Sequence, residues 1–221
     1  NSQIDRIEMK YQGKNLAQKT TFNSQNLQTD KINYQYDSKG NVIQEDIYLS
    51  LDFIQYKAVY KYDKQNRKIS EARYDKNSKK HYETVFKYDG KNLINRTTVN
   101  DKGEVEVSED ITYDGKGNVL SELTYEKYDN SKTLTKYAYD GNNNRTEWSV
   151  EKNGIPFMQA SYTYDKKGNT TLISVKDKDG KQVDSREYIF EYDEKGNWIK
   201  KTTKIKGVPQ FIAERTITYE D

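Results

Sequence analysis

The sequence has no cysteine, one histidine and only two prolines among its 221 residues. Without cysteine the chain has no disulfide, no thiolate metal site and no cysteine nucleophile. Most zinc sites and most catalytic triads need histidine or cysteine, so a single histidine disfavours both kinds of site. Long apolar runs of about 18 residues are also missing, and we therefore expect no membrane-spanning helix.

The chain also has no large excess of positive or negative charge. Lys and Arg total 37 and Asp and Glu total 35, which gives a net charge of only +2, and the two signs alternate along the chain. A protein that binds nucleic acid usually concentrates positive charge on one face. We therefore expect no nucleic-acid partner.

The compartment is indicated only weakly by the composition. A chain without cysteine suits a bacterial protein exported to the periplasm, the cell surface or the medium. A lipid anchor whose cysteine was trimmed away fits the same composition. We expect an exported protein, and the sequence does not indicate its oligomeric state.

An internal repeat dominates the sequence. A Tyr-Asp pair recurs at residues 36–37, 62–63, 88–89, 113–114, 139–140, 164–165 and 192–193, with degenerate copies at 11–12 and 219–220. The spacing of 25 to 28 residues divides the chain into eight units that start near residues 11, 36, 62, 88, 113, 139, 164 and 192. We therefore expect one repeat domain over residues 1–221, because repeats of this length stack into a continuous core.

Each Tyr-Asp pair begins a predicted hairpin turn. Two polar residues and Gly-Asn follow the pair, as in the segments 36–41, 113–118, 164–169 and 192–197. The Asp accepts hydrogen bonds from backbone N–H groups two or more residues on, and the Gly supplies the left-handed residue of a type I turn with a G1 bulge. Asn66 and Asn143 replace the Gly in two copies, and Asn tolerates positive φ best among other residues. The copy after Tyr88 is one residue shorter and predicts a different loop.

Alternating apolar and polar residues on both sides of the turn predict antiparallel strands. A second turn series lies midway between the Tyr-Asp turns, so each unit holds two strands and two turns. The predicted fold is an all-β, up-and-down antiparallel meander of about 16 strands with almost no helix. Such a wide sheet coils, because strand twist accumulates. We expect a strongly coiled open sheet or half-barrel lined by the tyrosine and Ile/Leu rows, and a closed barrel is the alternative.

The repeated Tyr-x-Tyr-Asp-x-x-Gly-Asn-x-Ile pattern resembles the YD repeat of the rearrangement-hotspot (RHS) family, over most of the chain from about Tyr11 to Asp221. The family motif usually has Gly-Arg-Leu where this chain has Gly-Asn-Val or Gly-Asn-Ile. The resemblance implies paired strands of a spiralling β-sheet, a surface or scaffold role, and carbohydrate binding. The chain also resembles short exported bacterial proteins of unknown function that are built from YD-like repeats.

Two tryptophans, Trp148 and Trp198, are the candidate ligand-binding residues. A flat indole ring can stack on a sugar or anchor a partner. Trp148 shares its parity with the aliphatic row, so core packing is the competing interpretation. Trp198 has the parity opposite to Ile199, which predicts a place on the outer face of the sheet, where a purely structural role competes with ligand binding.

The remaining polar candidates have simpler structural explanations. The Asp of every Tyr-Asp pair precedes the same turn, so turn capping accounts for it better than calcium binding or catalysis. Residues 177–180 superficially match a calcium loop but have no Glu at the required spacing. His81 lies near a turn and is expected at an exposed edge. We therefore expect no catalytic residue, no metal site and no cofactor.

The functional hypothesis is a non-enzymatic exported or surface repeat protein that binds a glycan or a surface protein. A carboxylate-dependent hydrolase is one alternative, although repeats supply carboxylates in equivalent copies whereas catalysis needs two in unlike environments. A structural protein that assembles through its edge strands is another. The tyrosine rows are either a packed core or an open groove, and the sequence leaves both interpretations open.

Overall fold

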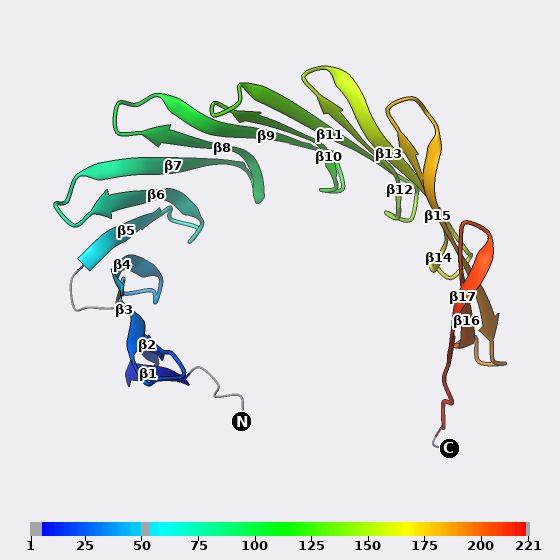
Figure 1. Ribbon diagram of the computed structural model, residues 1–221, viewed down its shortest axis with the longest axis horizontal. Helices are drawn as coiled ribbons and strands as arrows, with labels where there is room; N and C mark the ends of the chain where they lie inside the picture. The colour runs from blue at the N-terminus through cyan, green and yellow to red at the C-terminus, as the bar shows by residue number, and fades with distance from the viewer. Residues whose placement is uncertain (1–5, 50–53, 220–221) are drawn as a thin grey trace. The chain divides into compact units, whose positions relative to one another are not determined.

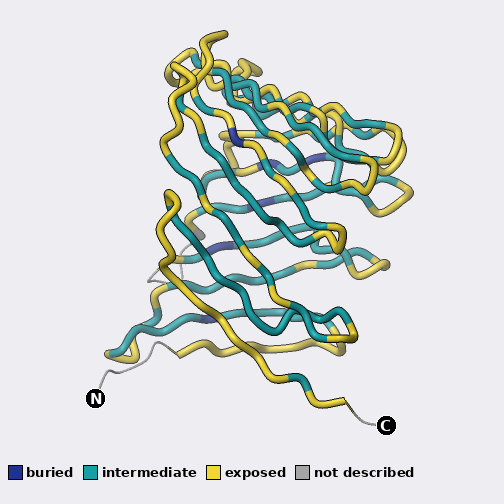
Figure 2. Tube along the Cα trace, turned by 90° about the vertical axis from the view of Figure 1, so that its right-hand side faces the viewer, coloured by how far each residue is buried: buried dark blue, intermediate teal, exposed yellow. Residues whose placement is uncertain are grey.

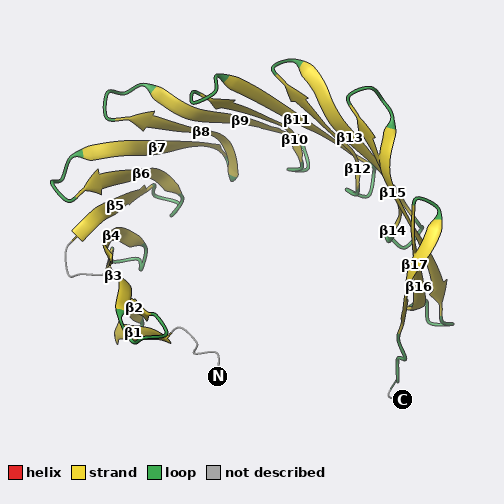
Figure 3. Cartoon of the chain, viewed as in Figure 1, coloured by secondary structure: helices red, strands yellow, loops and turns green. Residues whose placement is uncertain are grey.

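The computed structural model describes residues 6–49 and 54–219 and contains strands but no helix in this part of the chain (Figure 3). The strands are β1 (Arg6–Gln12), β2 (Asn15–Phe22), β3 (Gln28–Tyr36), β4 (Val42–Leu49), β5 (Ile54–Tyr62), β6 (Lys68–Asp75), β7 (Lys80–Asp89), β8 (Asn92–Asn100), β9 (Val105–Tyr113), β10 (Val119–Glu126), β11 (Ser131–Tyr139), β12 (Arg145–Lys152), β13 (Ile155–Tyr164), β14 (Thr170–Asp177), β15 (Gln182–Tyr192), β16 (Trp198–Ile205) and β17 (Val208–Glu214). The predicted all-β fold is confirmed, with one strand more than expected. Residues 220 and 221, the end of the last degenerate repeat, lie outside the described part.

The strands form an antiparallel meander, and within each compact unit consecutive strands pair, as β1 with β2, β7 with β8 and β11 with β12 do. The chain groups into two compact units, residues 1–109 with 126–128 and residues 110–125 with 129–221. In the first unit β1 pairs with β2 and is an edge strand, and in the second unit β17 pairs with β16 and is an edge strand. Each unit is thus an open sheet and not a closed barrel, and Figure 1 shows its successive strands rotating as sheet twist requires.

The Tyr-Asp turns have the predicted geometry. In the turn after Tyr36 the N–H of Gly40 donates to the carbonyl of Asp37 (3.1 Å), and the N–H of Asp37 donates to the carbonyl of Asn41 (2.9 Å). Gly40 has φ 87°, and the strand register shifts at Tyr36, as a bulge requires. Asn66 and Asn143 take the same left-handed place with φ 69° and 66°. The prediction that asparagine substitutes for glycine there is confirmed.

The shortened copy forms a tighter loop, also as predicted. Asp89 pairs directly with Asn92, so only Gly90 and Lys91 connect β7 to β8. Gly90 has φ 53°, the left-handed conformation that a two-residue hairpin loop favours. Tyr88 lies opposite Leu93, and the register then shifts by one residue at Ile94, so that Lys87 pairs with Asn95.

Strand pairing assigns the aromatic rows to one side of the sheet. Tyr34 pairs with Glu45 and Glu45 with Ala58, and residues that pair directly share a face. We call this side the tyrosine face. Among its members are Tyr34, Ile47, Tyr56, Tyr60, Arg73, Tyr82 and Phe86 in the first unit and Tyr137, Trp148, Tyr162, Val175 and Phe190 in the second.

Very little of the sheet is sealed from solvent (Figure 2). Only six of the residues with a described side chain are buried, namely Thr20, Ile47, Ala58, Ser70, Ala72 and Ala160. Most strand positions are half-buried, the aromatic rows among them. Within each unit the sheet is therefore held by contacts between adjacent strands and repeats rather than by a large sealed core.

Candidate functional site: the turn edge and the tyrosine face

The Asp of the repeat motif caps its turn. Asp37 Oδ1 accepts hydrogen bonds from the N–H groups of Lys39 and Asn41, both at 2.9 Å. The side-chain amide of Asn41 donates to the other carboxylate oxygen at 2.8 Å and is the main reason that the pKa of Asp37 is lowered. The pKa is also lowered in the equivalent residues Asp63, Asp114, Asp140, Asp165 and Asp193. The predicted capping role is confirmed.

The Asn that follows the Gly links several of the turns to the next repeat. Asn41 Nδ2 donates to Asn66 Oδ1 at 2.7 Å, across 25 residues of sequence. Asn118 Nδ2 donates in the same way to Asn143 Oδ1 at 3.2 Å. The amide thus bridges two turns while it holds its own Asp in place.

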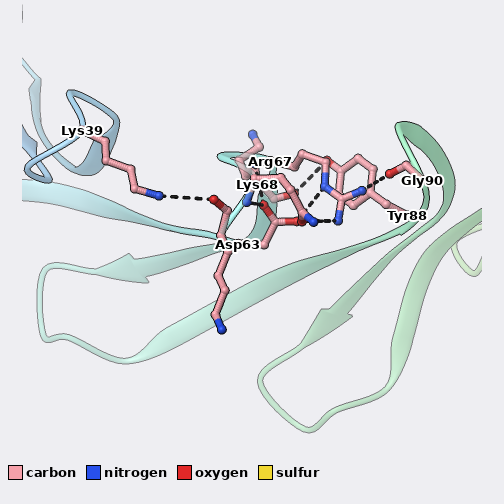
Figure 4. Close-up of polar contacts among 8 residues, drawn as sticks. Lys39, Asp63, Arg67, Lys68, Tyr88 and Gly90 are labelled. Atoms are coloured by element: carbon pink, nitrogen blue, oxygen red, sulfur yellow. Dashed lines mark hydrogen bonds and ion pairs between the residues drawn. The ribbon is translucent and has the colours of Figure 1, made fainter.

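Arg67 takes the position of this Asn in one repeat, and it too contacts its own Asp and the next turn (Figure 4). Its Nε donates to Asp63 Oδ2 at 2.6 Å, and its guanidinium also bonds the carbonyl of Gly90 in the next repeat. The guanidinium carbon lies 4.5 Å from the centre of the Tyr88 ring, a cation–π distance. Arginine and asparagine are therefore interchangeable here because both can reach the Asp and the next turn.

The motif tyrosine joins its repeat to the preceding one. The hydroxyl of Tyr62 donates to the carbonyl of Val42, and that of Tyr88 to the carbonyl of Lys68, both at 2.9 Å and both across 20 residues. Tyr36 and Tyr164 make equivalent bonds to Leu16 and Arg145. Near the C-terminus the partner changes, because the Tyr192 hydroxyl bonds the carboxylate of Asp165 and that of Tyr219 bonds Asp193.

Sequence reasoning missed this inter-repeat bond, although a signal was present. The position two residues before the motif tyrosine accepts Phe86, Ile111 and Phe190, whereas even the degenerate copies at 11–12 and 219–220, which have lost the Asp, keep the hydroxyl-bearing ring. Packing alone would accept phenylalanine at both positions. The difference between the two rows therefore indicates a hydrogen bond at the motif tyrosine.

Trp148 lies on the tyrosine face in β12, opposite Tyr137 and Ala160, and is half-buried. Its Nε1 donates to the hydroxyl of Tyr162 at 2.7 Å. A depression of about 270 Å³ adjoins it. The lining consists of small residues and a few polar ones: Lys136, Tyr137, Ala138, Glu147, Trp148, Ser149, Gln159, Ala160 and Ser161. Six of these residues, namely Lys136, Ala138, Glu147, Ser149, Gln159 and Ser161, pair with one another and alternate with Trp148 along the strands, so the depression lies on the face of the sheet opposite to the indole.

Trp198 is more covered than the sequence suggests. Its ring meets the ring of Phe190 edge to face at 6.5 Å, and the Arg215 guanidinium lies 3.9 Å from the ring centre. Because Phe190 belongs to the tyrosine face, the expected outer-face position of Trp198 is wrong. The register shift at Tyr192, which pairs with Trp198, breaks the simple alternation that the prediction assumed. Strands β13 to β15 separate the two tryptophans, so they do not form one platform.

Cations alternate with rings along the tyrosine face. Lys68 Nζ lies 5.3 Å from the Tyr60 ring and 5.1 Å from the Phe86 ring of the next repeat. The Arg145 guanidinium lies between Tyr137 and Tyr162 in the same way, at 5.8 and 5.0 Å. These side chains present rings and hydrogen-bond donors side by side at repeat spacing.

Carboxylates accept hydrogen bonds from tyrosine hydroxyls of this row and raise their pKa. The Tyr137 hydroxyl donates to Glu122 Oε2 at 3.0 Å, and burial together with this carboxylate raises the pKa of Tyr137 to about 12. Tyr60 donates to Glu45 Oε2 at 3.1 Å, and its pKa is raised for the same reasons. These hydroxyls therefore stay protonated and act as hydrogen-bond donors at neutral pH.

The segment 177–180, which superficially matches a calcium loop, forms an ordinary turn. Asp177 Oδ1 accepts from the N–H groups of Asp179 and Lys181, both at 3.0 Å. In the described ranges no three His, Cys, Asp or Glu side chains gather as metal ligands would. His81 is exposed near its turn, as expected. A search of the described residues for a long apolar helix of membrane-spanning type finds none.

Comparison with known proteins gives low similarity throughout. No protein-family model matches the chain, and no curated protein matches it. Two crystal structures of TcdB2-TccC3 assemblies match 96% and 97% of this chain but only 15% of theirs, with 13% and 11% identity and TM-scores of 0.35 and 0.40. A porin-like protein from Bacteroides uniformis ATCC 8492 matches 94% of this chain and 92% of its own, with 9% identity and a TM-score of 0.36.

These likenesses carry no argument about function. The chain spans about 15% of the length of the TcdB2-TccC3 chains. The resemblance to YD repeats therefore rests on the motif and its turn geometry.

Proposed function

We propose that this protein is a non-enzymatic repeat scaffold, exported or held at a cell surface, that binds an extended glycan or a protein segment on its tyrosine face. The observation that carries the proposal is the half-exposed Trp148, with its indole anchored by the hydroxyl of Tyr162 and the Arg145 guanidinium 5.0 Å from the Tyr162 ring. Aromatic surface with a few convergent polar groups is the usual composition of a ligand site.

The repeat architecture supports an extended ligand. Rings and cations recur along the tyrosine face at repeat spacing, as Lys68 between Tyr60 and Phe86 and Arg145 between Tyr137 and Tyr162 demonstrate. Stacked repeats present long continuous binding surfaces. A polymer or an extended peptide can contact several such elements at once, whereas a compact small molecule contacts one.

The state of the carboxylates favours a scaffold over a hydrolase. A pair of catalytic carboxylates needs one member with a raised pKa. In the described part of the chain, every carboxyl group whose pKa departs from its ordinary value moves downward, Asp165 to about 2. Burial opposes the shift at Asp165, and hydrogen bonds from Tyr192 and Asn169 outweigh it. These carboxylates hold turns and repeats together.

The test is binding to a panel of soluble polysaccharides, measured by affinity electrophoresis. Trp148→Ala should weaken retention by about tenfold or more, because it removes a stacking platform. Trp198→Ala should change it less, since Arg215 already covers that ring. Tyr128→Ala, which alters a fully exposed ring in a turn, is the control and should have no effect. The proposal would be overturned if the protein retained no polymer but hydrolysed a polysaccharide, and if substitution of one carboxylate abolished that hydrolysis.

Assembly through edge strands is a second candidate function, favoured by the apolar side chains at both edges. In β1 the residues Ile7 and Met9 are about half exposed, and in β17 the residues Phe211 and Ile212 are 65% and 63% exposed. Unpaired edges with apolar side chains are templates for pairing with another chain. Light scattering at several concentrations should then show a dimer that Phe211→Lys dissociates. A monomer at all concentrations would exclude this function.

A further inference from the structure

A second depression, of about 250 Å³, lies over strands β5, β6 and β7 of the first unit. The residues that line it are Gln55, Tyr56, Arg73, Tyr74, Asp75, His81 and Tyr82. It holds the only histidine of the chain. Its volume is below the usual range for drug-sized ligands and suits a single small ring.

The strand register places the side chains that line this depression close to one another. Tyr56 pairs with Asp75 and Arg73 pairs with Tyr82, and these four residues lie on the tyrosine face. The register shifts between Arg73 and Tyr74, which adds one residue to β7 beside the turn. Such a bulge re-aims a side chain, and here it leaves His81 next to Asp75, with Nε2 3.5 Å from Oδ2.

Arg73 breaks the pattern of the repeats. The equivalent position holds Thr21, Ile47, Thr98, Thr124, Val150, Val175 and Thr203 in the other units. A guanidinium at a row position that otherwise carries apolar or threonine side chains is a local departure of the kind that marks functional sites. Its side chain is 57% exposed, and its Nε forms only a long ion pair with Glu71 Oε1, at 3.9 Å and beyond hydrogen-bond length. The guanidinium is therefore available to a ligand.

Rings surround this guanidinium. The guanidinium carbon lies 5.6 Å from the centre of the Tyr56 ring, and the Tyr82 side chain is 48% exposed. The imidazole of His81 lies 6.3 Å from the Tyr82 ring, tilted by 40°. An apolar face of a ligand can stack on Tyr82 while a charged group reaches Arg73.

The polar rim is held in place by the turn. Asp75 Oδ1 accepts the N–H groups of Asn77 (2.8 Å) and Lys79 (2.9 Å), and these bonds, that of Lys79 foremost, lower the pKa of Asp75. The fixed carboxylate keeps His81 at the mouth of the depression. His81 and the remaining lone pairs of Asp75 can then exchange hydrogen bonds with ligand hydroxyl groups.

We propose that this depression binds an acidic sugar residue, a hexuronate, with its ring on Tyr82, its carboxylate on the Arg73 guanidinium and its hydroxyls on Asp75 and His81. A planar guanidinium matches a carboxylate with two parallel hydrogen bonds. A neutral sugar leaves Arg73 unused, and an aromatic acid leaves the polar rim unsatisfied. This site uses other strands than Trp148 and does not depend on the function proposed above.

The experiment is a titration of the full chain with D-glucuronate, followed by NMR of the single imidazole and by calorimetry. D-glucose, benzoate and acetate serve as matched probes for the ring with hydroxyls, the ring with a carboxylate and the carboxylate alone. Glucuronate should shift the His81 signals in a saturable way. Glucose and benzoate should bind at least about tenfold more weakly, because each lacks one set of contacts and hydrogen bonds to charged groups are the stronger ones.

Arg73→Ala and Arg186→Ala form a matched pair of variants. Arg186 also lies on the tyrosine face, is 52% exposed and is close to a carboxylate two residues before it, at 3.3 Å from Asp184. Arg73→Ala should weaken glucuronate binding by about tenfold or more, whereas Arg186→Ala should not change it. Both changes are at exposed positions, so circular dichroism should show both variants folded.

The outcomes separate the two proposals. No saturable shift of His81 with glucuronate, equal binding of glucuronate and acetate, or equal loss in the Arg73 and Arg186 variants would each overturn the hexuronate site. Loss of polysaccharide retention in Trp148→Ala bears only on the proposed function. Glucuronate binding that survives Trp148→Ala and is lost in Arg73→Ala supports the second site.

Discussion

The hydroxyl of Tyr62 offers the sharpest test of how the repeats are joined. Tyr62 ends β5, and its hydroxyl donates to the carbonyl of Val42 at the start of β4, in the preceding repeat. Both residues are half-buried. Tyr62→Phe removes this one hydrogen bond and keeps the ring, so any change in stability measures the bond rather than the packing.

The expected loss follows from the chemistry of the bond. A neutral intramolecular hydrogen bond contributes about 0.5–1.5 kcal/mol net, and a partly buried carbonyl left without its partner places the loss in the upper half of that range. We expect Tyr62→Phe to lower the free energy of unfolding by about 1 kcal/mol. For a chain of this size that corresponds to a decrease of about 2–4 °C in Tm. With a typical urea m-value the midpoint falls by about 0.3–1 M.

The assay is urea unfolding followed by circular dichroism, with Tyr128→Phe as the matched control. The Tyr128 side chain is fully exposed, so loss of its hydroxyl should leave the midpoint unchanged. If Tyr62→Phe and Tyr128→Phe have the same midpoint, the hydroxyl does not join the repeats and the proposed role of the motif tyrosine is wrong.

A double variant extends the test to two repeats. Tyr88→Phe removes the equivalent bond to the carbonyl of Lys68, which shares no atom with the Tyr62 bond. The two losses should add to about 2 kcal/mol, within about 0.5 kcal/mol, as independent sites do. A double variant no less stable than either single variant would contradict independent bonds at each repeat.

Three further predictions concern the turns. Gly117→Ala should destabilise the protein by about 1 kcal/mol because Gly117 has φ 90°, whereas Gly115→Ala in the same turn should be neutral or slightly stabilising. An added Cβ meets no neighbouring atom at either position, so only the backbone conformation distinguishes the two variants. Equal effects in urea unfolding would refute the turn assignment. The contribution of Asp165 to stability should be constant above about pH 5 and be lost from pH 5 towards 2. The pKa of Asp165 is about 2 in the folded chain, below the unfolded value of about 3.9, so the unfolded state binds more protons in this range. Asp165→Asn should reduce that dependence in unfolding curves recorded across this range, and stability that rises on acidification would contradict the sign. Chelation with EDTA should leave Tm unchanged if the Asp side chains only cap turns, and a Tm that falls with EDTA and recovers with calcium would reveal a metal site.

The turns were predictable because their chemistry is local. Positive φ at Gly40, Asn66 and Asn143 follows from residue type within six positions of the motif. Capping by Asp37 is local for the same reason, since its hydrogen-bond partners lie two and four residues away. Alternation of apolar and polar residues then fixes which positions share a face, except where a bulge intervenes.

Trp198 and His81 show where this reasoning failed or fell short. Both lie beside a register shift, and a shift by one residue changes which side chains meet. The sequence pattern placed Trp198 on the outer face, whereas its ring packs against Phe190. The sequence pattern correctly predicted an exposed edge position for His81, but it did not predict that Arg73 and Tyr82 lie near it.

The sequence by itself determined an antiparallel repeat with its turns, strand lengths and tyrosine rows, because each of these depends on residues a few positions apart. The tertiary structure alone decided how the repeats are joined, since the Asn41, Arg67 and Tyr62 bonds reach across 20 to 25 residues. It also decided that the tyrosine face remains half-open and that Arg73, Asp75 and His81 share one depression. Such contacts depend on the register between neighbouring strands, which a single pattern of alternating residues does not specify.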